Sequence, residues 1–240
     1  MFKATYHLVK AQLASFQTER QTYAKIILAP FTIFVAMQLI DLFASLYIDK
    51  NFRDHRTWST AAELTSLLQI ALVFFSFFYI FKSYVLQMRF IVNKEEPSSI
   101  FSIHLFKQSY LVLAYKILFI VFWTIFLGLF GFILSTLILL YVSTWYSFNI
   151  ISVATDQPVD FFKVSCQIGK TAFMNLLINI CVSLLVLALI ALVTLVSIMC
   201  GVKLSMTGVA LPYITYIYLF ILLGCYSRSF TIWQKEHLAS

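Results

Sequence analysis

The fold of this chain is decided by an uncharged stretch near its middle, ILFIVFWTIFLGLFGFILSTLILLYVSTWYSFNIISVAT, which covers residues 117–155. Two further stretches without Asp, Glu, Lys or Arg cover residues 171–202 and 204–227. About 20 apolar residues are enough for a helix to cross a bilayer, so each stretch is long enough. Because backbone amides inside lipid must be satisfied within their own segment, and strands would alternate polar and apolar positions, these runs are expected to be helices. The sequence therefore predicts an all-α, polytopic membrane protein.

The composition excludes an ordinary soluble domain. Hydrophobic residues make up 61% of the 240 residues and charged residues only 11%, whereas about a quarter of a soluble chain is charged. The net charge of +7 does not indicate nucleic-acid binding, because the basic residues are scattered between apolar stretches and form no basic face. The positive charge indicates membrane orientation instead.

The apolar pattern predicts six membrane-spanning helices within a single membrane domain, residues 1–240. The run over residues 110–153 is too long for one crossing, and Gly128 and Gly131 permit a tight turn that divides it. Six crossings place both termini on the same side of the membrane. The predicted spans cover residues 24–48, 62–81, 110–127, 132–153, 173–200 and 209–233.

Residues 1–22 predict an amphipathic helix ahead of the first span. Its apolar residues recur at steps of four and three, with polar and basic residues between them. Beside a span, such a helix is expected to lie in the headgroup layer with its aromatic face toward the acyl chains and its cations toward phosphate. An ordinary solvent-facing bundle helix is the alternative. The apolar positions are Phe2, Tyr6, Val9, Leu13 and Phe16.

The distribution of Lys and Arg predicts the orientation of the chain. Twelve basic residues fall on the side of the termini and four on the opposite side, with Lys116 left out as intramembrane. The positive-inside rule therefore places both termini in the cytoplasm. The richer side carries Lys3, Lys10, Arg20, Lys25, Lys82, Arg89, Lys94, Lys107, Lys163, Lys170, Arg228 and Lys235. The opposite side carries Lys50, Arg53, Arg56 and Lys203.

A weak internal repeat precedes the later spans. EPSSIF, residues 96–101, aligns with QPVDFF, residues 157–162, and in each segment a proline can open a helix. Each is followed by apolar residues at helical spacing and then by two spans, and residues 1–22 precede the first two spans in the same manner. The chain therefore predicts three repeated units, each with one interfacial helix and two crossings. The alternative is a chance resemblance among amphipathic segments.

Two charged residues within the spans, Asp41 and Lys116, are the candidate functional residues. A carboxylate near a helix centre costs about 2.5–3.5 kcal/mol on insertion scales and usually faces a partner or water. Asp41 lies only seven residues before the end of its predicted span at residue 48, so either a structural placement or an ion or proton role remains open. Lys116 lies nearer the cytoplasmic side, and its flexible stem is expected to reach the headgroups rather than Asp41.

No catalytic, cofactor-binding or metal site is predicted. The four histidines fall in separate segments, so the sequence indicates no metal cluster. GKT, residues 169–171, matches the end of a phosphate-binding loop, but Val164 stands where that motif requires a glycine. Glu63 fits a helix-capping box that starts at Thr60 better than it fits a catalytic acid. The chain is therefore expected to bind no cofactor and to have no enzymatic activity.

The C-terminal half resembles a bacterial family. Its residues 154–180 read ATDQPVDFFKVSCQIGKTAFMNLLINI, and residues 211–213 read LPY. These segments are similar to the six-helix membrane domain that occurs alone in uncharacterised bacterial inner-membrane proteins and fused to some glycerophosphodiester phosphodiesterases. The resemblance implies a membrane fold and a location in the bacterial inner membrane. It does not imply the phosphodiesterase activity, because the chain shows no such domain.

Three functions compete on the sequence alone. The first is a non-enzymatic component of the membrane that binds membrane lipids or another membrane protein, with no nucleic-acid partner. The second is the permease subunit of an ATP-driven exporter, which needs a separate ATPase subunit and a cytoplasmic coupling segment, for which residues 94–108 are the best candidate. The third is a lipid-modifying enzyme, which needs polar residues converging at one depth. The sequence favours the first function.

Overall fold

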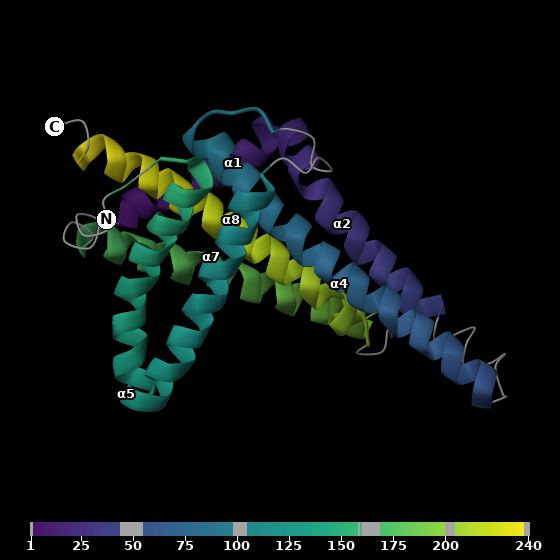
Figure 1. Ribbon diagram of the computed structural model, residues 1–240. Coiled ribbons are helices and arrows are strands. Elements are labelled where there is room, and N and C mark those ends of the chain that lie inside the picture. Colours follow the sequence, from purple (N-terminus) through teal and green to yellow (C-terminus); the bar gives the residue numbers. More distant parts are fainter. Residues whose placement is uncertain are drawn as a thin grey trace.

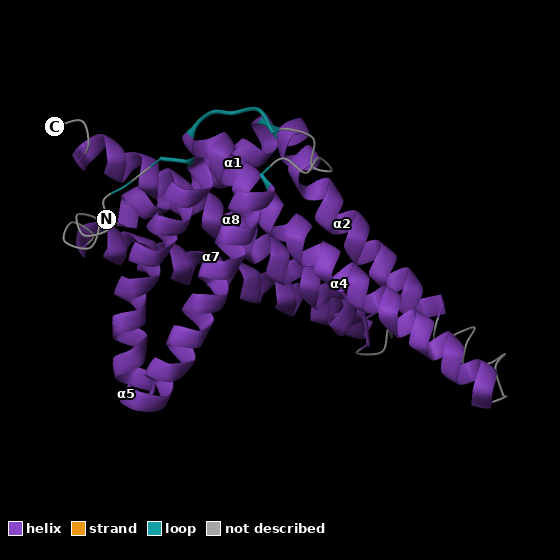
Figure 2. Cartoon of the chain, viewed as in Figure 1, coloured by secondary structure: helices purple, strands orange, loops and turns teal. Residues whose placement is uncertain are grey.

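The computed structural model describes residues 2–43, 55–97, 105–157, 159, 169–199 and 205–237. In this part of the chain the regular structure is helical and no strand is present, which confirms the predicted all-α class (Figure 2). The helices are α1 (Phe2–Thr18), α2 (Arg20–Phe43), α4 (His55–Val92), α5 (Phe106–Thr155), α7 (Gly169–Met199) and α8 (Ser205–His237).

Four helices in the described part of the chain are long and apolar enough to cross a membrane. Their apolar stretches correspond to the first, second, third and fifth predicted spans, and they make the chain compatible with membrane insertion. The predicted fourth and sixth spans fall in the second half of α5 and in α8, so the count of six stays a prediction. The four stretches are Arg20–Ile40, Glu63–Val92, Lys107–Ile125 and Thr171–Leu195.

Helix α5 folds back on itself and forms a hairpin of two legs (Figure 1). The reversal falls at Gly131, where the backbone leaves the helical conformation with φ 71° and ψ 171°. Because a side chain would strain that conformation, the turn depends on a glycine. The two legs approach each other again near their ends, where the rings of Tyr115 and Tyr146 lie 5.8 Å apart between centroids.

The other long helices also run in antiparallel pairs. Helices α2 and α4 pack together, and the rings of Tyr23 and Phe90, from the start of one helix and the end of the other, lie 5.8 Å apart. Helices α7 and α8 pack in the same manner, with the hydroxyls of Ser183 and Tyr218 3.3 Å apart. The described helices therefore form three hairpins, of which the α5 hairpin points away from the other two (Figure 1).

The three hairpins meet at one end, which we call the base. The base comprises α1, the start of α2, the end of α4, both ends of α5, the start of α7 and the C-terminal half of α8. Most of the buried side chains lie here, whereas the distal parts of α4, α5 and α7 expose Leu, Ile and Phe. The largest fully buried side chains are Trp233, Lys82, Phe148, Phe220 and Phe230.

Helix α1 lies at the base and is joined to α2 almost without interruption. The backbone hydrogen bonds continue through Glu19, whose N–H donates to Ser15 O at 2.9 Å and whose carbonyl accepts from Tyr23 N–H at 3.1 Å. Helix α1 also packs on α7 and α8. The two other interfacial segments that the repeat predicts fall largely on residues 98–104 and 160–168, which lie outside the described residues.

Candidate functional site at the base of the helices

The structure does not bring the two predicted functional residues together. Asp41 lies near the distal end of α2, and its side chain lies outside the described residues. Lys116 lies in the first leg of α5, where its side chain is half-buried. The distal end of α2 and the α5 hairpin diverge from the base in different directions (Figure 1). A functional role for either residue stays a prediction.

The base is joined instead by an arginine at the end of α4. Arg89 donates from Nε to the carbonyl of Ala154 at 2.8 Å and from Nη1 to Glu95 Oε2 at 3.1 Å, and its Nη2 pairs with Asp156 Oδ2. The Arg89 side chain is only 12% exposed, whereas both carboxylates are more accessible. A single guanidinium therefore connects α4, the segment that follows α4, and the C-terminal end of α5.

Three amides extend this network to α8. Asn93 donates from Nδ2 to Glu95 Oε1 at 2.8 Å and to the carbonyl of Thr155 at 3.1 Å. Gln157 Nε2 donates to Asn93 Oδ1 at 2.8 Å, and Gln234 Nε2 donates to Gln157 Oε1 at 2.6 Å. Because hydrogen bonds between helices stabilise their association, this network holds α4, α5 and α8 together.

The backbone around this network is strained. Lys94, Leu105 and Asp156 have φ values of 60°, 69° and 52°, and they are the non-glycine residues with positive φ in the described part of the chain. All three flank helix ends at the base, and such conformations cost about 1–3 kcal/mol each. At the end of α5, a hydrogen bond of 3.1 Å from Gln157 N–H to Ser152 O supports the turn at Asp156.

A second polar contact joins α1, α4 and α8. Arg228 Nε donates to Gln12 Oε1 at 2.9 Å, and Gln87 Nε2 donates to the carbonyl of Phe220 at 2.9 Å. Gly224 lies between the two glutamines, because a Cβ atom there would be 2.6 Å from Gln12 Cδ and 2.7 Å from Gln87 Nε2. The missing side chain at Gly224 therefore lets both glutamines approach α8.

Helix α1 turns its polar side toward the bundle. In an ordinary bundle helix the apolar stripe would face the core. Here Phe2, Tyr6 and Leu13 of the predicted stripe are exposed, and only Val9 and Phe16 pack partly against the core. The choice between an interfacial helix and a solvent-facing bundle helix for residues 1–22 stays a prediction. The buried side chains of α1 are Thr5, Leu8, Gln12 and Ser15.

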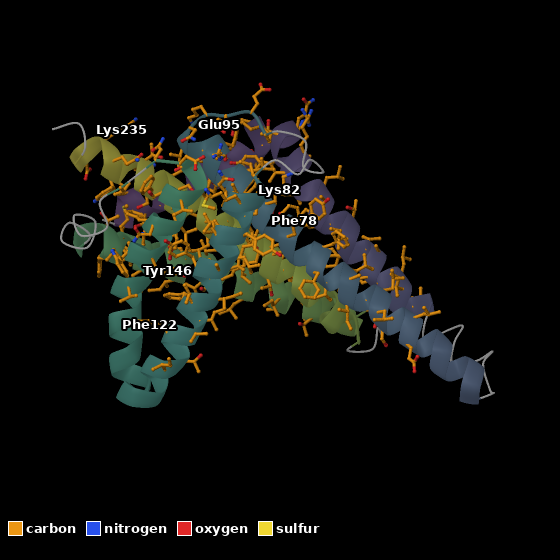
Figure 3. The ribbon with its side chains drawn as sticks, viewed as in Figure 1. Phe78, Lys82, Glu95, Phe122, Tyr146 and Lys235 are labelled. Carbon is orange, nitrogen blue, oxygen red and sulfur yellow. The ribbon has the colours of Figure 1, made fainter. Side chains whose placement is uncertain are left out.

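Several residues of the base were not recognisable from the sequence. The positive-inside rule places Lys82 on the cytoplasmic side, and in the structure Lys82 is fully buried within α4, which continues to Val92 (Figure 3). Arg89 and Arg228 entered only the same charge count. The sequence feature that could have indicated them is the segment after the apolar part of α4, where Ser83 and Gln87 stand four residues apart, on one face of a helix.

The polarity of the chain falls along α5 with distance from the base. Tyr146 lies nearer to the base than Phe122, which is exposed on the first leg (Figure 3).

Within the described residues no group of three or more His, Cys, Asp and Glu side chains could hold a metal ion. Because Glu95 and Asp156 both face Arg89, their carboxylates act as ion-pair partners.

Comparisons of the chain with family models, with curated proteins and with solved structures found no match. The resemblance of residues 154–180 to the bacterial six-helix membrane domain therefore stays a prediction.

Proposed function

We propose that this chain is a multi-pass protein of the bacterial inner membrane, without enzymatic activity, that binds membrane lipid through α1. The observation that carries the proposal is the orientation of α1. Its mostly polar buried face packs on α7 and α8 at the base, and Phe2, Tyr6 and Leu13 are exposed on the opposite side. An exposed aromatic stripe beside membrane-spanning helices fits the headgroup layer of a bilayer.

The exposed apolar residues of α1 form one continuous flank. At about 100° per residue, Phe2, Tyr6 and Leu13 fall within an arc of roughly 40°. Lys10 lies beside this flank, with its Nζ 5.9 Å from the centre of the Tyr6 ring. Aromatic rings beside a flexible cation are typical of a membrane–water interface, where the rings contact acyl chains and the cation reaches the headgroups.

The arrangement of the base also supports cytoplasmic termini. Both ends of the chain lie at the same end of the structure as the base (Figure 1). The segment after α4, residues 93–97, and the end of α5 lie there as well. Most of the richer set of Lys and Arg residues lies on the helices of the base, and the positive-inside rule assigns this set to the cytoplasm.

Spin labels at two neighbouring residues of α1 test the proposal. Leu13 lies on the apolar flank, whereas Ala14, also exposed, lies about 100° around the helix. In a background with all native cysteines replaced by alanine, Leu13→Cys and Ala14→Cys are each labelled in the full-length protein in lipid nanodiscs. We expect the label at residue 13 to be more accessible to oxygen and the label at residue 14 to a water-soluble nickel complex.

Equal accessibility of both labels to the nickel complex would contradict the proposal, because the flank of α1 would then lie in water. Low accessibility of the label at residue 13 to both reagents would also contradict it, because a protein surface rather than lipid would then cover the flank.

A permease subunit of an ATP-driven exporter is the second candidate function. The observation that favours it is the divergence of the distal part of the α5 hairpin from the other helices (Figure 1). The middle of the expected coupling segment over residues 94–108, residues 98–104, lies outside the described residues. Co-purification of a stoichiometric ATPase would support this function, and purification without one would favour lipid binding.

A further inference from the structure

We infer that α1 selects anionic phospholipid, an inference that rests on the proposed binding of lipid through α1. The surface that would take the lipid consists of the apolar flank of α1 together with the cations that border it. Phe2, Tyr6 and Leu13 form the flank, and Lys3 and Lys10 form its border. A lipid with a net negative headgroup is complementary to both parts of this surface.

The charge of this region is almost entirely positive. Residues 2–25 contain Lys3, Lys10, Arg20 and Lys25, all exposed, and a single acidic residue, Glu19, which is half-buried. The difference of four cations and one anion gives this segment a net charge of +3. A zwitterionic headgroup carries its own cation beside the phosphate, so a surface of this kind favours an anionic headgroup.

The two lysines of α1 lie where headgroup phosphates would meet them. At about 100° per residue, Lys3 and Lys10 lie within about 20° of each other and roughly 40–100° from the members of the apolar flank. They point away from the buried face, on which Gln12 bonds Arg228. When the flank enters the acyl region, the flexible stems of the lysines therefore place their ammonium groups at the depth of the headgroups.

Two other exposed lysines of the base, Lys94 and Lys235, lack this combination. Lys94 is followed by Glu95 and Glu96, and Lys235 is followed by Glu236, all of them exposed. The adjacent carboxylates cancel much of the attraction that these lysines would exert on an anionic headgroup. Lys94 and Lys235 are therefore matched controls, since their neutralisation removes the same formal charge without altering α1.

Lipid titration of the full-length protein tests the inference. The delipidated protein in detergent is titrated with phosphatidylglycerol or phosphatidylcholine of identical acyl chains, and bound lipids are counted by native mass spectrometry. We expect tighter binding of phosphatidylglycerol. The double variant Lys3→Gln/Lys10→Gln should weaken phosphatidylglycerol binding about 25-fold, since each cation near an anionic surface contributes roughly a fivefold change in affinity. Phosphatidylcholine binding should not change.

The control variant Lys94→Gln/Lys235→Gln should leave the affinity for phosphatidylglycerol within about twofold of the original protein. Equal affinity for both lipids, or an equal loss in both double variants, would overturn the inference. The spin-label experiment separates this failure from failure of the proposed function. A lipid-exposed label at residue 13 without any preference for phosphatidylglycerol would refute the anionic selectivity alone. A label at residue 13 exposed to water would refute both.

Discussion

The base of this protein and the distal parts of its helices differ in what their side chains contact. At the base, polar side chains such as Gln12, Gln87 and Arg89 are largely buried and bond between helices. In the distal parts, large apolar side chains such as Leu118 and Leu187 are mostly exposed. Because lipid is as apolar as leucine, burial of leucine provides little reason for two helices to associate in a bilayer. The helices therefore associate where polar bonds and close packing hold them.

The largest expected effect compares two leucines of α7. Leu177 lies at the base and is 8% exposed, whereas Leu187 lies ten residues further along the helix and is 60% exposed. Leu177→Ala removes packed atoms and should cost about 2–3 kcal/mol. Leu187→Ala should cost less than about 0.5 kcal/mol. Unfolding of the two purified variants by SDS in mixed micelles measures both values. Equal losses would show that the distal part is packed as tightly as the base.

A smaller effect is expected at the arginine that joins the hairpins. Arg89→Gln removes the ion pairs with Glu95 and Asp156 and weakens the bond to the carbonyl of Ala154. Hydrogen bonds to charged groups contribute about 1.5–3 kcal/mol. Because both carboxylates are exposed, we expect the free energy of unfolding to fall by about 2 kcal/mol. The same unfolding assay measures it. Arg20→Gln, at an exposed position, is the control, and an equal loss there would argue against a joining role for Arg89.

The smallest expected effect compares two glycines. Gly224→Ala pushes Gln12 and Gln87 away from α8 and should cost about 1–2 kcal/mol. It should also speed cleavage within α1 by a protease, because the contact of Gln12 with Arg228 holds α1 on the bundle. Gly128→Ala meets no atom within 4 Å and should stabilise α5 slightly, by up to about 1 kcal/mol. Unchanged cleavage of α1 in Gly224→Ala would contradict the assigned role of Gly224.

Hydrophobic periodicity predicted the helical class, the amphipathic α1 and the position of the reversal within α5, because each of these depends on neighbouring residues. It was less informative about helix length. The second predicted span, residues 62–81, covers only the apolar part of α4; the sequence allows this helix to continue to Val92, and α4 runs from His55 to Val92. Beyond that part, the helix continues through Ser83 and Gln87, which bond to Tyr216 and Phe220 of α8.

The base itself could not be predicted from the sequence for a physical reason. Asp41 and Lys116 were conspicuous because each is a single charge in an apolar run. Arg89 and Asp156 are 67 residues apart in the chain, and Gln12 and Arg228 are 216 residues apart. Local patterns carry no information about such distant partners, so only the folded chain shows which polar residues meet.

The separation of the distal helices is the most direct test of association at the base. Phe75 on α4 and Ile125 on the first leg of α5 are both exposed, and the helices that carry them diverge (Figure 1). Spin labels are attached at Phe75→Cys and Ile125→Cys in the protein in nanodiscs. The distance between the two labels is measured by pulsed electron–electron double resonance. We predict a mean distance well beyond the span of two labels on packed helices, whose axes lie roughly 8–10 Å apart and to which the two label linkers add. A short distance with a narrow distribution would show that α4 and α5 pack along their whole length, and would contradict the association of the α5 hairpin with α4 at the base alone.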